Sequence, residues 1–333
     1  MSTYRLATEA DDAAMRRLLR ENGMPTWVEM TMEREPSYFA GHNQFGRDWA
    51  VIAEEKGDVV GMYSAAVLPV YCNGVPSRVG YLGGLRVDPR HRYRIRQLRG
   101  GYESVRRLAP EQVPLWFTVI AAENTAARRL LEAGIAGLPL YYPQGEYVTF
   151  ALATPVAPRT SWRRATPADS DAIVQFHNEQ AKQFQYAPDI DSDLVSRLPF
   201  YIAGDIDAVA AFWDQRAFKQ IVAKRYRSRS AIRIYNAFAR LTGRVALPKE
   251  GEALDQTFIA FFACRQPSCE LLRGLLAHCE TPVASLGMHA ANPLRPIIER
   301  FKPISYPARI YAVTFNGQPS TREFPAQPEA ALL

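Results

Sequence analysis

The chain has 333 residues, of which 47% are hydrophobic and 11% aromatic, enough to build more than one core. Its net charge is +6 and its pI is near 9.1, so its surface attracts anions. No apolar run approaches the roughly 20 residues that a membrane span needs, and the N-terminus lacks a secretion signal. We therefore expect a cytoplasmic protein without a membrane partner.

The cysteines and histidines do not form a recognisable metal motif. The four cysteines, Cys72, Cys264, Cys269 and Cys279, show no zinc-like pairing, and the five histidines lie far apart. Free thiols in a reducing compartment are the simplest interpretation. We expect no metal cofactor.

Hydrophobic periodicity predicts alternating strands and helices in the first half. In chain order, these are a strand at 4–7, a helix at 11–21, strands at 49–54, 59–68 and 78–87, a helix at 97–108, a strand at 115–121, a helix at 125–133 and a final hairpin. Between the first helix and the second strand we expect a loop-rich region that contains Glu29, Glu33 and Glu35.

The second half repeats landmarks of the first. Residues 4–11 (YRLATEAD) and 162–169 (WRRATPAD) each place a short strand before Thr-x-x-Asp, a signal for a helix start. Residues 124–132 and 292–299 also resemble each other, and each leads to a Tyr-containing strand. The order of these matches predicts two tandem domains, 1–152 and 160–316, separated by a proline-containing linker. The remaining residues, 317–333, are expected to form a flexible tail or a strap across the surface.

The segment from Tyr81 to Gly101 carries the strongest functional signal. A short apolar strand is broken by Pro89 and continues through an arginine-dense loop into a helix. The start of a helix offers unpaired backbone N–H groups, and nearby arginines add charged donors that suit a pyrophosphate. The alternative is an ordinary strand-to-helix turn with a solvated basic face.

This segment resembles the acyl-CoA-binding segment of the GCN5-related N-acetyltransferases (GNAT), in the order hydrophobic strand, Val-x-Pro-x-x-Arg, loop, helix. The resemblance implies a mixed α/β (α+β) fold with two tandem GNAT-like acyl-CoA N-acyltransferase domains, and acetyl-CoA or another acyl-CoA as co-substrate. The cofactor-binding residues that it implies are Leu85, Arg86, Val87, Arg92, Tyr93, Arg94, Ile95, Arg96, Gln97 and Asn124.

The loop departs from the family pattern at two positions. These are usually glycine but are Ile95 and Gln97 here, while glycines come later as Gly100 and Gly101. Glycine lets a backbone approach a ligand closely. The departure is compatible with a shifted loop or with a site that has lost its cofactor, and Asn124 is alternatively a helix cap.

The resemblance also implies that an amine attacks the thioester directly. A backbone N–H near Arg86 and Val87 is expected to stabilise the oxyanion. The phenol that protonates the leaving thiolate in many relatives is replaced by Leu131, which makes Tyr141 and Tyr142 the nearest candidates in the sequence. Either tyrosine is alternatively a core or edge residue of a hairpin.

Glu29, together with Glu33 and Glu35, falls in the region that usually lines the acceptor site of the family. These carboxylates are candidates to hold a cationic amine and to relay its proton through water. The alternative is a solvated polar face.

In the second half, the expected strand 258–264 and helix 270–278 are joined by a turn, 265–269, that is neither a basic loop nor contains glycine, so we expect a degenerate second domain. Residues 215–249 contain many lysines and arginines and no carboxylate. Ile232, Tyr235, Phe238 and Leu241 recur there near helical spacing, which predicts an amphipathic helix with a basic outer face. Nucleic-acid binding is the alternative, but no nucleic-acid-binding motif accompanies the segment.

The function that these features favour is N-acyl transfer, with acetyl transfer first, from acyl-CoA to a small-molecule or peptide amine. One competing hypothesis is a non-catalytic acyl-CoA-binding or protein-interaction module, because the loop glycines and the helix tyrosine are absent. Another is a transferase for a longer acyl chain.

Overall fold

The computed structural model describes residues 2–25, 28–91, 95–155, 162–321 and 323–333. The first half contains β1 (Thr3–Leu6), α1 (Asp12–Glu21), β2 (Met24–Pro25), β3 (Val28–Glu33), β4 (Arg47–Glu55), β5 (Asp58–Cys72), β6 (Val75–Val87), α2 (Ile95–Leu108), β7 (Trp116–Ala121), α3 (Thr125–Glu132) and β8 (Leu140–Ala153). The second half contains β9 (Trp162–Arg164), α4 (Ser170–Ala181), α5 (Ser192–Arg197), β10 (Phe200–Ala203), β11 (Ala208–Trp213), β12 (Gln220–Tyr226), α6 (Arg229–Thr242), β13 (Gln256–Cys264), α7 (Cys269–Leu276), β14 (Val283–His289), α8 (Arg295–Glu299) and β15 (Ile304–Thr314).

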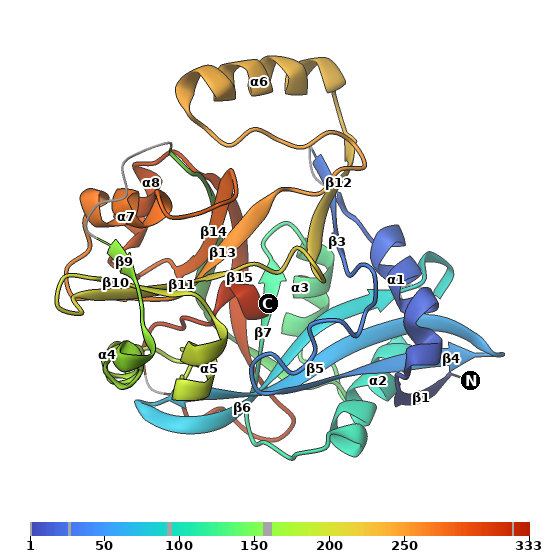
Figure 1. The fold of residues 1–333 in the computed structure, drawn as a ribbon. Coiled ribbons are helices and arrows are strands. Elements are labelled where there is room, and N and C mark those ends of the chain that lie inside the picture. Colours follow the sequence, from blue (N-terminus) through green and yellow to red (C-terminus); the bar gives the residue numbers. More distant parts are fainter. Residues whose placement is uncertain (1, 26–27, 92–94, 156–161, 322) are drawn as a thin grey trace.

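One twelve-stranded mixed sheet runs through both halves, in the order β1-β4-β5-β6-β7-β15-β8-β14-β13-β11-β10-β9 (Figure 1). This confirms the predicted mixed α/β architecture. A second, three-stranded sheet has the order β12-β3-β2 and joins the two halves. Its strand β3 lies in the region that the sequence predicted to be loop-rich.

The repeated start of each half has the same local structure. Thr8 and Thr166 each form a capping box with the aspartate three residues later. A strand arginine then binds that aspartate, with 2.8 Å between Arg5 Nη1 and Asp11 Oδ2 in the first half. The same pairing recurs between Arg163 and Asp169 at 2.7 Å. The predicted internal repeat is therefore confirmed at both helix starts.

The last strands of the two halves are exchanged. Antiparallel pairing places β15 of the second half between β7 and β8 of the first half. β8 in turn pairs with β14 of the second half, with Tyr147 opposite His289. The expected hairpin within the first half is therefore wrong, because its place beside β7 is taken by a strand from the other half.

The core is also shared between the halves. Phe117 of β7 stacks on Tyr186 of the second half, with 4.7 Å between ring centroids and an interplanar angle of 10°. Backbone hydrogen bonds link Tyr186 N to Tyr71 O and Tyr71 N to Ala187 O, each at 2.8 Å. Aromatic stacking and paired backbone groups thus fix the two halves against each other.

The C-terminal segment, residues 325–332, is packed into the molecule, and Figure 1 shows the C-terminus at its centre. Ala326 is fully buried. Gln327 Nε2 donates to the Gly287 backbone oxygen of β14 at 2.8 Å. Glu329 Oε2 accepts from the backbone N–H of Phe261 in β13, also at 2.8 Å. The expectation of a flexible tail is therefore wrong for this segment, which fills the space between β13 and β14.

None of the helices in the described ranges has the length and apolar character that crossing a bilayer requires. Within the same residues, no group of histidine, cysteine, aspartate and glutamate side chains is arranged to hold a metal ion.

We predict that Glu329→Ala destabilises the protein by about 2–4 kcal/mol, because two backbone N–H groups lose their acceptor and each unpaired group costs about 1–3 kcal/mol. These are the N–H groups of Phe261 and Ala331. Chemical denaturation measures the free energy of unfolding, and hydrogen exchange of residues 325–333 should accelerate. Glu323→Ala, an exposed change in the same segment, is the matched control. Equal stability of the two variants would contradict this role of Glu329.

A second prediction concerns His177, which is buried in α4 against the Phe261 ring. Burial lowers the pKa of His177 to about 4, whereas an unfolded histidine has a pKa near 6.5. The unfolded chain therefore binds the proton first, and stability falls as the pH drops from about 6.5 towards about 4. Between about pH 7 and pH 5, the free energy of unfolding of wild type should fall by about 2 kcal/mol more than that of His177→Gln. Other titrating groups contribute to both proteins alike, so parallel pH profiles would refute the assignment.

Candidate active site

β6 and β7 run parallel and pair at Gly80–Trp116 and Tyr81–Phe117, after which the two strands separate. Gly80 permits this close approach, because a Cβ there would lie 2.2 Å from the Trp116 ring. Thr118 Oγ1 then donates across the strands to the Leu82 backbone oxygen at 2.6 Å. Since the register pairs end here, the two strands part towards the carboxyl end of β6, and we call the place where they part the opening of the first half.

A bulge in β6 lies beside this opening. The register of β6 on β5 shifts by one residue, so that Gly84 and Leu85 together oppose a single residue of β5. Gly84 has φ +62°, a conformation that glycine adopts without strain. A Cβ on Gly84 would also lie 2.6 Å from Ser64 Oγ. A bulge interrupts the hydrogen-bond ladder between strands and redirects the backbone N–H and C=O groups of its residues. The sequence predicted the thioester to bind beside this part of β6.

Arg86 follows the bulge and is the cationic side chain closest to it in sequence. Its Nη1 donates to the Leu85 backbone oxygen at 2.9 Å, while its buried Nε finds no acceptor among the described residues. Burial lowers the pKa of Arg86, and the phenols of Tyr38, Tyr81 and Tyr306 interact electrostatically with its charge. A buried guanidinium N–H without an acceptor is costly, so the site suits an oxygen atom of a bound molecule.

The connection between β6 and α2 starts at a buried aspartate. Asp88 Oδ2 lies 2.8 Å from Arg90 Nη2, and this hydrogen bond holds the pKa of Asp88 well below its usual range. The next three predicted cofactor-binding residues, Arg92, Tyr93 and Arg94, lie outside the described residues. Their contact with a pyrophosphate stays a prediction.

α2 begins at Ile95, so the predicted residues Ile95, Arg96 and Gln97 form its first turn. Ile95 and Arg96 are exposed, whereas the backbone oxygen of Gln97 accepts from Tyr4 OH at 2.6 Å. The start of α2 is therefore tied to β1 through Gln97 and Tyr4, and contact of its first turn with a cofactor stays a prediction.

The two late glycines lie inside α2 and not in the loop before it. A Cβ on Gly100 would come within 2.6 Å of the Tyr4 ring. This glycine lets α2 pack closely against β1, which explains its place without a ligand. The hypothesis that the phosphate loop has shifted to Gly100 and Gly101 is therefore wrong.

Asn124 caps α3, where its Oδ1 accepts from the Ala127 backbone N–H at 3.2 Å. The side chain is exposed. Capping uses only its carbonyl oxygen, and contact of its amide nitrogen with the cofactor stays a prediction.

Tyr141 and Tyr142 point to different surroundings. Tyr141 OH is 2.6 Å from Tyr102 OH of α2, and burial raises the pKa of Tyr141 well above its usual value. Tyr142 OH lies 3.5 Å from the Gly317 backbone oxygen. Neither phenol has a contact with Arg86, whereas Tyr306, which the sequence did not single out, interacts with its charge.

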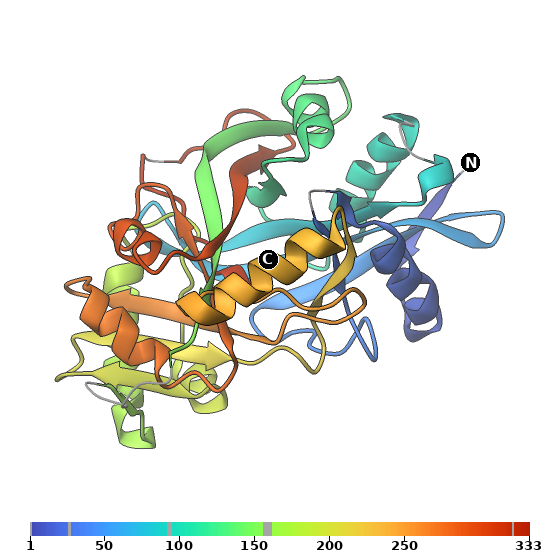
Figure 2. The ribbon, with the colours of Figure 1, turned by 90° about the horizontal axis from the view of Figure 1, so that it is seen from above.

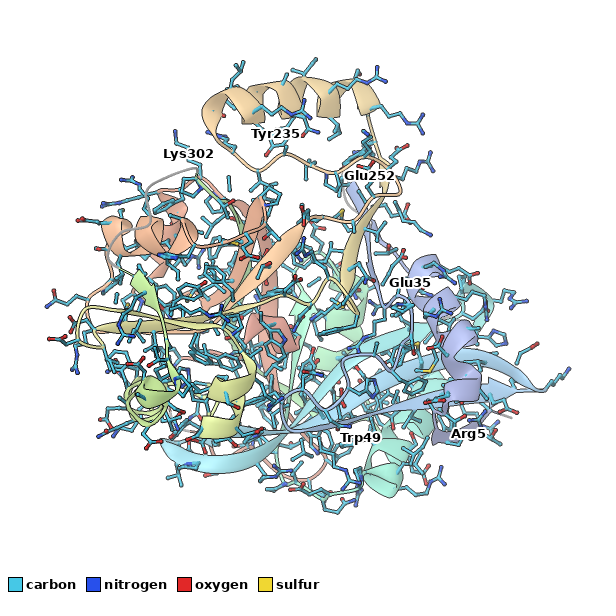
Figure 3. The ribbon with its side chains drawn as sticks, in the orientation of Figure 1. Arg5, Glu35, Trp49, Tyr235, Glu252 and Lys302 are labelled. Atoms are coloured by element: carbon cyan, nitrogen blue, oxygen red, sulfur yellow. The ribbon has the colours of Figure 1, made fainter. Side chains whose placement is uncertain are left out.

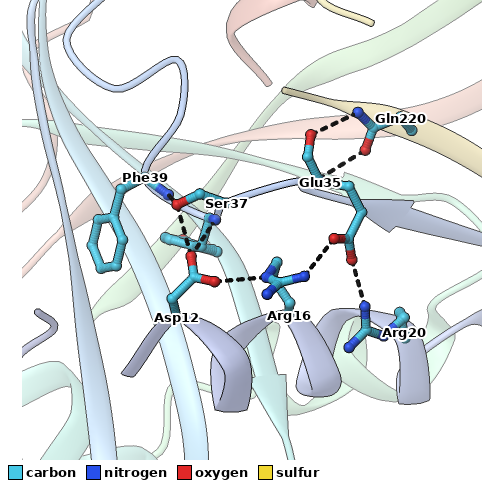
Figure 4. A network of polar contacts seen from close by, with 8 residues as sticks. Asp12, Arg16, Arg20, Glu35, Ser37, Phe39 and Gln220 are labelled. Carbon is cyan, nitrogen blue, oxygen red and sulfur yellow. Dashed lines mark hydrogen bonds and ion pairs between the residues drawn. The ribbon is translucent and has the colours of Figure 1, made fainter. Parts of the chain in front are cut away.

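Two of the three candidate carboxylates, those of Glu33 and Glu35, are engaged in polar contacts, and all three residues lie in or next to β3. Glu35 binds both Arg16 and Arg20 of α1, and its backbone pairs with the Gln220 side chain of the second half (Figure 4). Glu33 accepts from Thr31 Oγ1 at 2.7 Å. Glu29 lies opposite Arg225 in the β3–β12 pair. This cluster anchors β3, and a direct role for Glu29 in catalysis stays a prediction.

The second half has a corresponding opening, where Phe261, Met288 and Glu329 line a cavity of about 220 Å³. β13 and β14 pair in parallel from Gln256 to Phe258 only. A bulge then places Phe261 at φ +54°, where the first half has Gly84. The Phe261 N–H binds the Glu329 carboxylate, whose pKa burial raises to about 7.

Lys219 binds the C-terminal segment next to the opening of the second half. Its Nζ donates to the backbone oxygens of Ala331 and Leu333 at 3.1 and 2.6 Å. Burial lowers the pKa of Lys219 to about 7. The two halves therefore differ: Glu329 of the C-terminal segment binds the bulge N–H of the second half, while Arg86 follows the bulge of the first.

No protein-family model matches the chain, and no curated protein matches it in sequence. Solved structures do match its fold. N-myristoyltransferase from Saccharomyces cerevisiae with bound myristoyl-CoA aligns with a TM-score of 0.62 and 11% identity, over 96% of this chain and 80% of that one. Another structure of that enzyme, with myristoyl-CoA and inhibitors, has a TM-score of 0.60 and 12% identity, over 98% and 86%.

A GCN5-related N-acetyltransferase from Anabaena variabilis aligns with a TM-score of 0.53 and 10% identity, over 94% of this chain and 72% of that one. At such identities the likeness concerns the fold alone. The chain thus has the GNAT fold, in the two tandem halves that its sequence predicted, and shares it with these acyltransferases.

Proposed function

We propose that the protein is an acyl-CoA-dependent N-acyltransferase whose active site is the opening between β6 and β7. The observation that carries the proposal is the difference between the two openings. In the second half, the Glu329 carboxylate accepts a hydrogen bond from the N–H of the bulge residue Phe261. In the first half, the bulge contains Gly84, and the buried Nε of Arg86 has no acceptor among the described residues. One chain would then bind one acyl-CoA.

In the proposed reaction, the amine nitrogen of the acceptor attacks the thioester carbon. A carbon–nitrogen bond forms, the carbon–sulfur bond breaks, and negative charge develops first on the carbonyl oxygen and then on sulfur. In this proposal the bulge backbone and Arg86 stabilise the oxyanion, a role of fixed donors in many acyl transfers. The amine proton leaves with a base, for which Glu29 remains the candidate from sequence.

Protonation of the thiolate needs an acid, and Tyr141 and Tyr142 remain the candidates that the sequence singled out. Burial keeps Tyr141 protonated, but a raised pKa makes it a weak acid towards a thiol with a pKa near 8.5. Tyr306 is a third candidate because it interacts with the charge of Arg86. Replacing each of the three tyrosines in turn by phenylalanine and comparing the kcat values ranks them as candidate acids.

The acyl chain is open between acetyl and longer groups. The Saccharomyces cerevisiae neighbour holds myristoyl-CoA, and the Anabaena variabilis neighbour is named an acetyltransferase. Acceptors of the amine class, either small molecules or peptides, fit the proposal. A non-catalytic acyl-CoA-binding module is the competing function, because the loop glycines and the usual helix tyrosine are missing.

The first test is titration calorimetry with coenzyme A, acetyl-CoA and myristoyl-CoA. We expect one site per chain, and we expect the triple variant Arg92→Ala/Arg94→Ala/Arg96→Ala to weaken binding more than tenfold. The reason is that charge-assisted hydrogen bonds contribute about 1.5–3 kcal/mol each. Arg106→Ala, near the other end of α2, is the control. Unchanged affinity of the triple variant would refute this placement of the pyrophosphate.

The second test is release of free thiol from acyl-CoA across a panel of amines. We expect Arg86→Gln to lower kcat about 100-fold, as loss of one oxyanion donor does elsewhere, with the affinity for coenzyme A nearly unchanged. Arg78→Gln, an exposed change on the same strand, controls for effects on β6. Binding without turnover for wild type across the panel would favour the non-catalytic module instead.

A further inference from the structure

The outer side of α6 carries an apolar stripe that faces solvent. Ile234, Phe238 and Leu241 are 72%, 47% and 88% exposed. Their spacing of four and three residues places them on one face of the helix. Among the described residues, the other large exposed apolar side chains are scattered over β1, β6, α2 and β8, as is usual for a protein surface.

The opposite face of α6 holds the helix on the protein. Ile232 and Ala239 are buried there, and Tyr235, labelled in Figure 3, donates from its hydroxyl to the Val245 backbone oxygen at 3.0 Å. The Asn236 side chain makes two hydrogen bonds to the Leu247 backbone, each at 2.8 Å. Folding of α6 therefore does not depend on its outer stripe.

Cationic side chains border the stripe. Residues 215–249 contain no carboxylate. Arg233 and Arg240 are exposed, and neither forms an ion pair with any described residue. Arg244 lies over the Phe238 ring, with 5.2 Å from Cζ to the ring centroid. Positive charge at the edge of an exposed apolar stripe is typical of helices that lie in a lipid interface.

The position of α6 leaves this side accessible. Figure 1 shows the helix at the outer edge of the molecule, beyond the three-stranded sheet, and Figure 2 shows its full length from above, not covered by other elements. Its attachment through β12 and the segment after it sets it apart from the twelve-stranded sheet. A flat surface can approach along the entire helix.

We propose that α6 docks this protein on the surface of an anionic lipid bilayer. Ile234, Phe238 and Leu241 enter the boundary between headgroups and acyl chains, and the flanking arginines bind lipid phosphates. A second copy of the chain fits less well, because two such helices would oppose like charges. Nucleic acid would match the charge but would leave the apolar stripe exposed. This proposal departs from the expectation of no membrane partner, which rested on the lack of an apolar run long enough to span a bilayer.

The test is flotation of the full-length protein with vesicles of phosphatidylcholine alone or mixed equally with phosphatidylglycerol. Wild type should float only with the anionic vesicles, and added salt should weaken the binding. Both Ile234→Ser/Phe238→Ser/Leu241→Ser and Arg233→Glu/Arg240→Glu should bind at least tenfold more weakly. Val75→Ser and Arg164→Glu, exposed changes on other elements, should bind like wild type. Circular dichroism and thermal unfolding check that each variant is folded.

A tryptophan added to the stripe gives a positive readout, taken as the difference from wild type, which has five tryptophans. Fluorescence of Leu241→Trp should shift to shorter wavelength with anionic vesicles, whereas Val75→Trp should not shift. Three outcomes would overturn the proposal: no flotation of folded wild type, equal flotation with neutral vesicles, or flotation that both α6 variants retain. Dimerisation in light scattering that the serine variant abolishes, without vesicle binding, would assign the face to a second copy. Oligonucleotide binding without vesicle binding would assign it to nucleic acid. Acyl transfer can succeed or fail independently of each result.

Discussion

The exchange of last strands is the constraint on which the rest of the structure depends. Because β15 lies between β7 and β8, neither half can complete its sheet without the other. The twelve-stranded sheet and the core around Phe117 and Tyr186 follow from that exchange. It also returns the chain to the centre of the molecule, so that the residues after β15 reach the second half. A repeated sequence thereby produces two halves with different surroundings.

That asymmetry separates the two otherwise similar openings. Each lies where two parallel strands part beside a bulge, but the bulge residue is Gly84 in the first half and Phe261 in the second. At Phe261 the backbone N–H already has a carboxylate acceptor, Glu329. At the first bulge, a buried nitrogen of Arg86 still lacks one among the described residues. Polar groups without partners in a protein interior are rare, and they tend to mark places where a ligand binds.

Local signals predicted the local structure well. The Thr-x-x-Asp repeats gave matching helix starts, and the strand before Pro89 ends at Val87 as expected. Local signals could not predict the strand exchange, because strands paired in a hairpin within one half and strands paired across the two halves have the same apolar pattern. For the same reason the proline-containing C-terminal segment resembled a surface tail, although pairing across the molecule buries Ala326. At the site, the sequence indicated the backbone near Arg86 but not that the Nε atom of its side chain is buried without an acceptor among the described residues.

The central claim is that the opening of the first half, and not that of the second, receives the acyl-CoA thioester. A crystal structure of the full-length protein with coenzyme A tests it most directly. The account predicts the pantetheine arm between β6 and β7, with the sulfur near Leu85 and Arg86 and the pyrophosphate at the start of α2. Coenzyme A between β13 and β14 after displacement of Glu329, or in neither opening at saturating concentration, would contradict it.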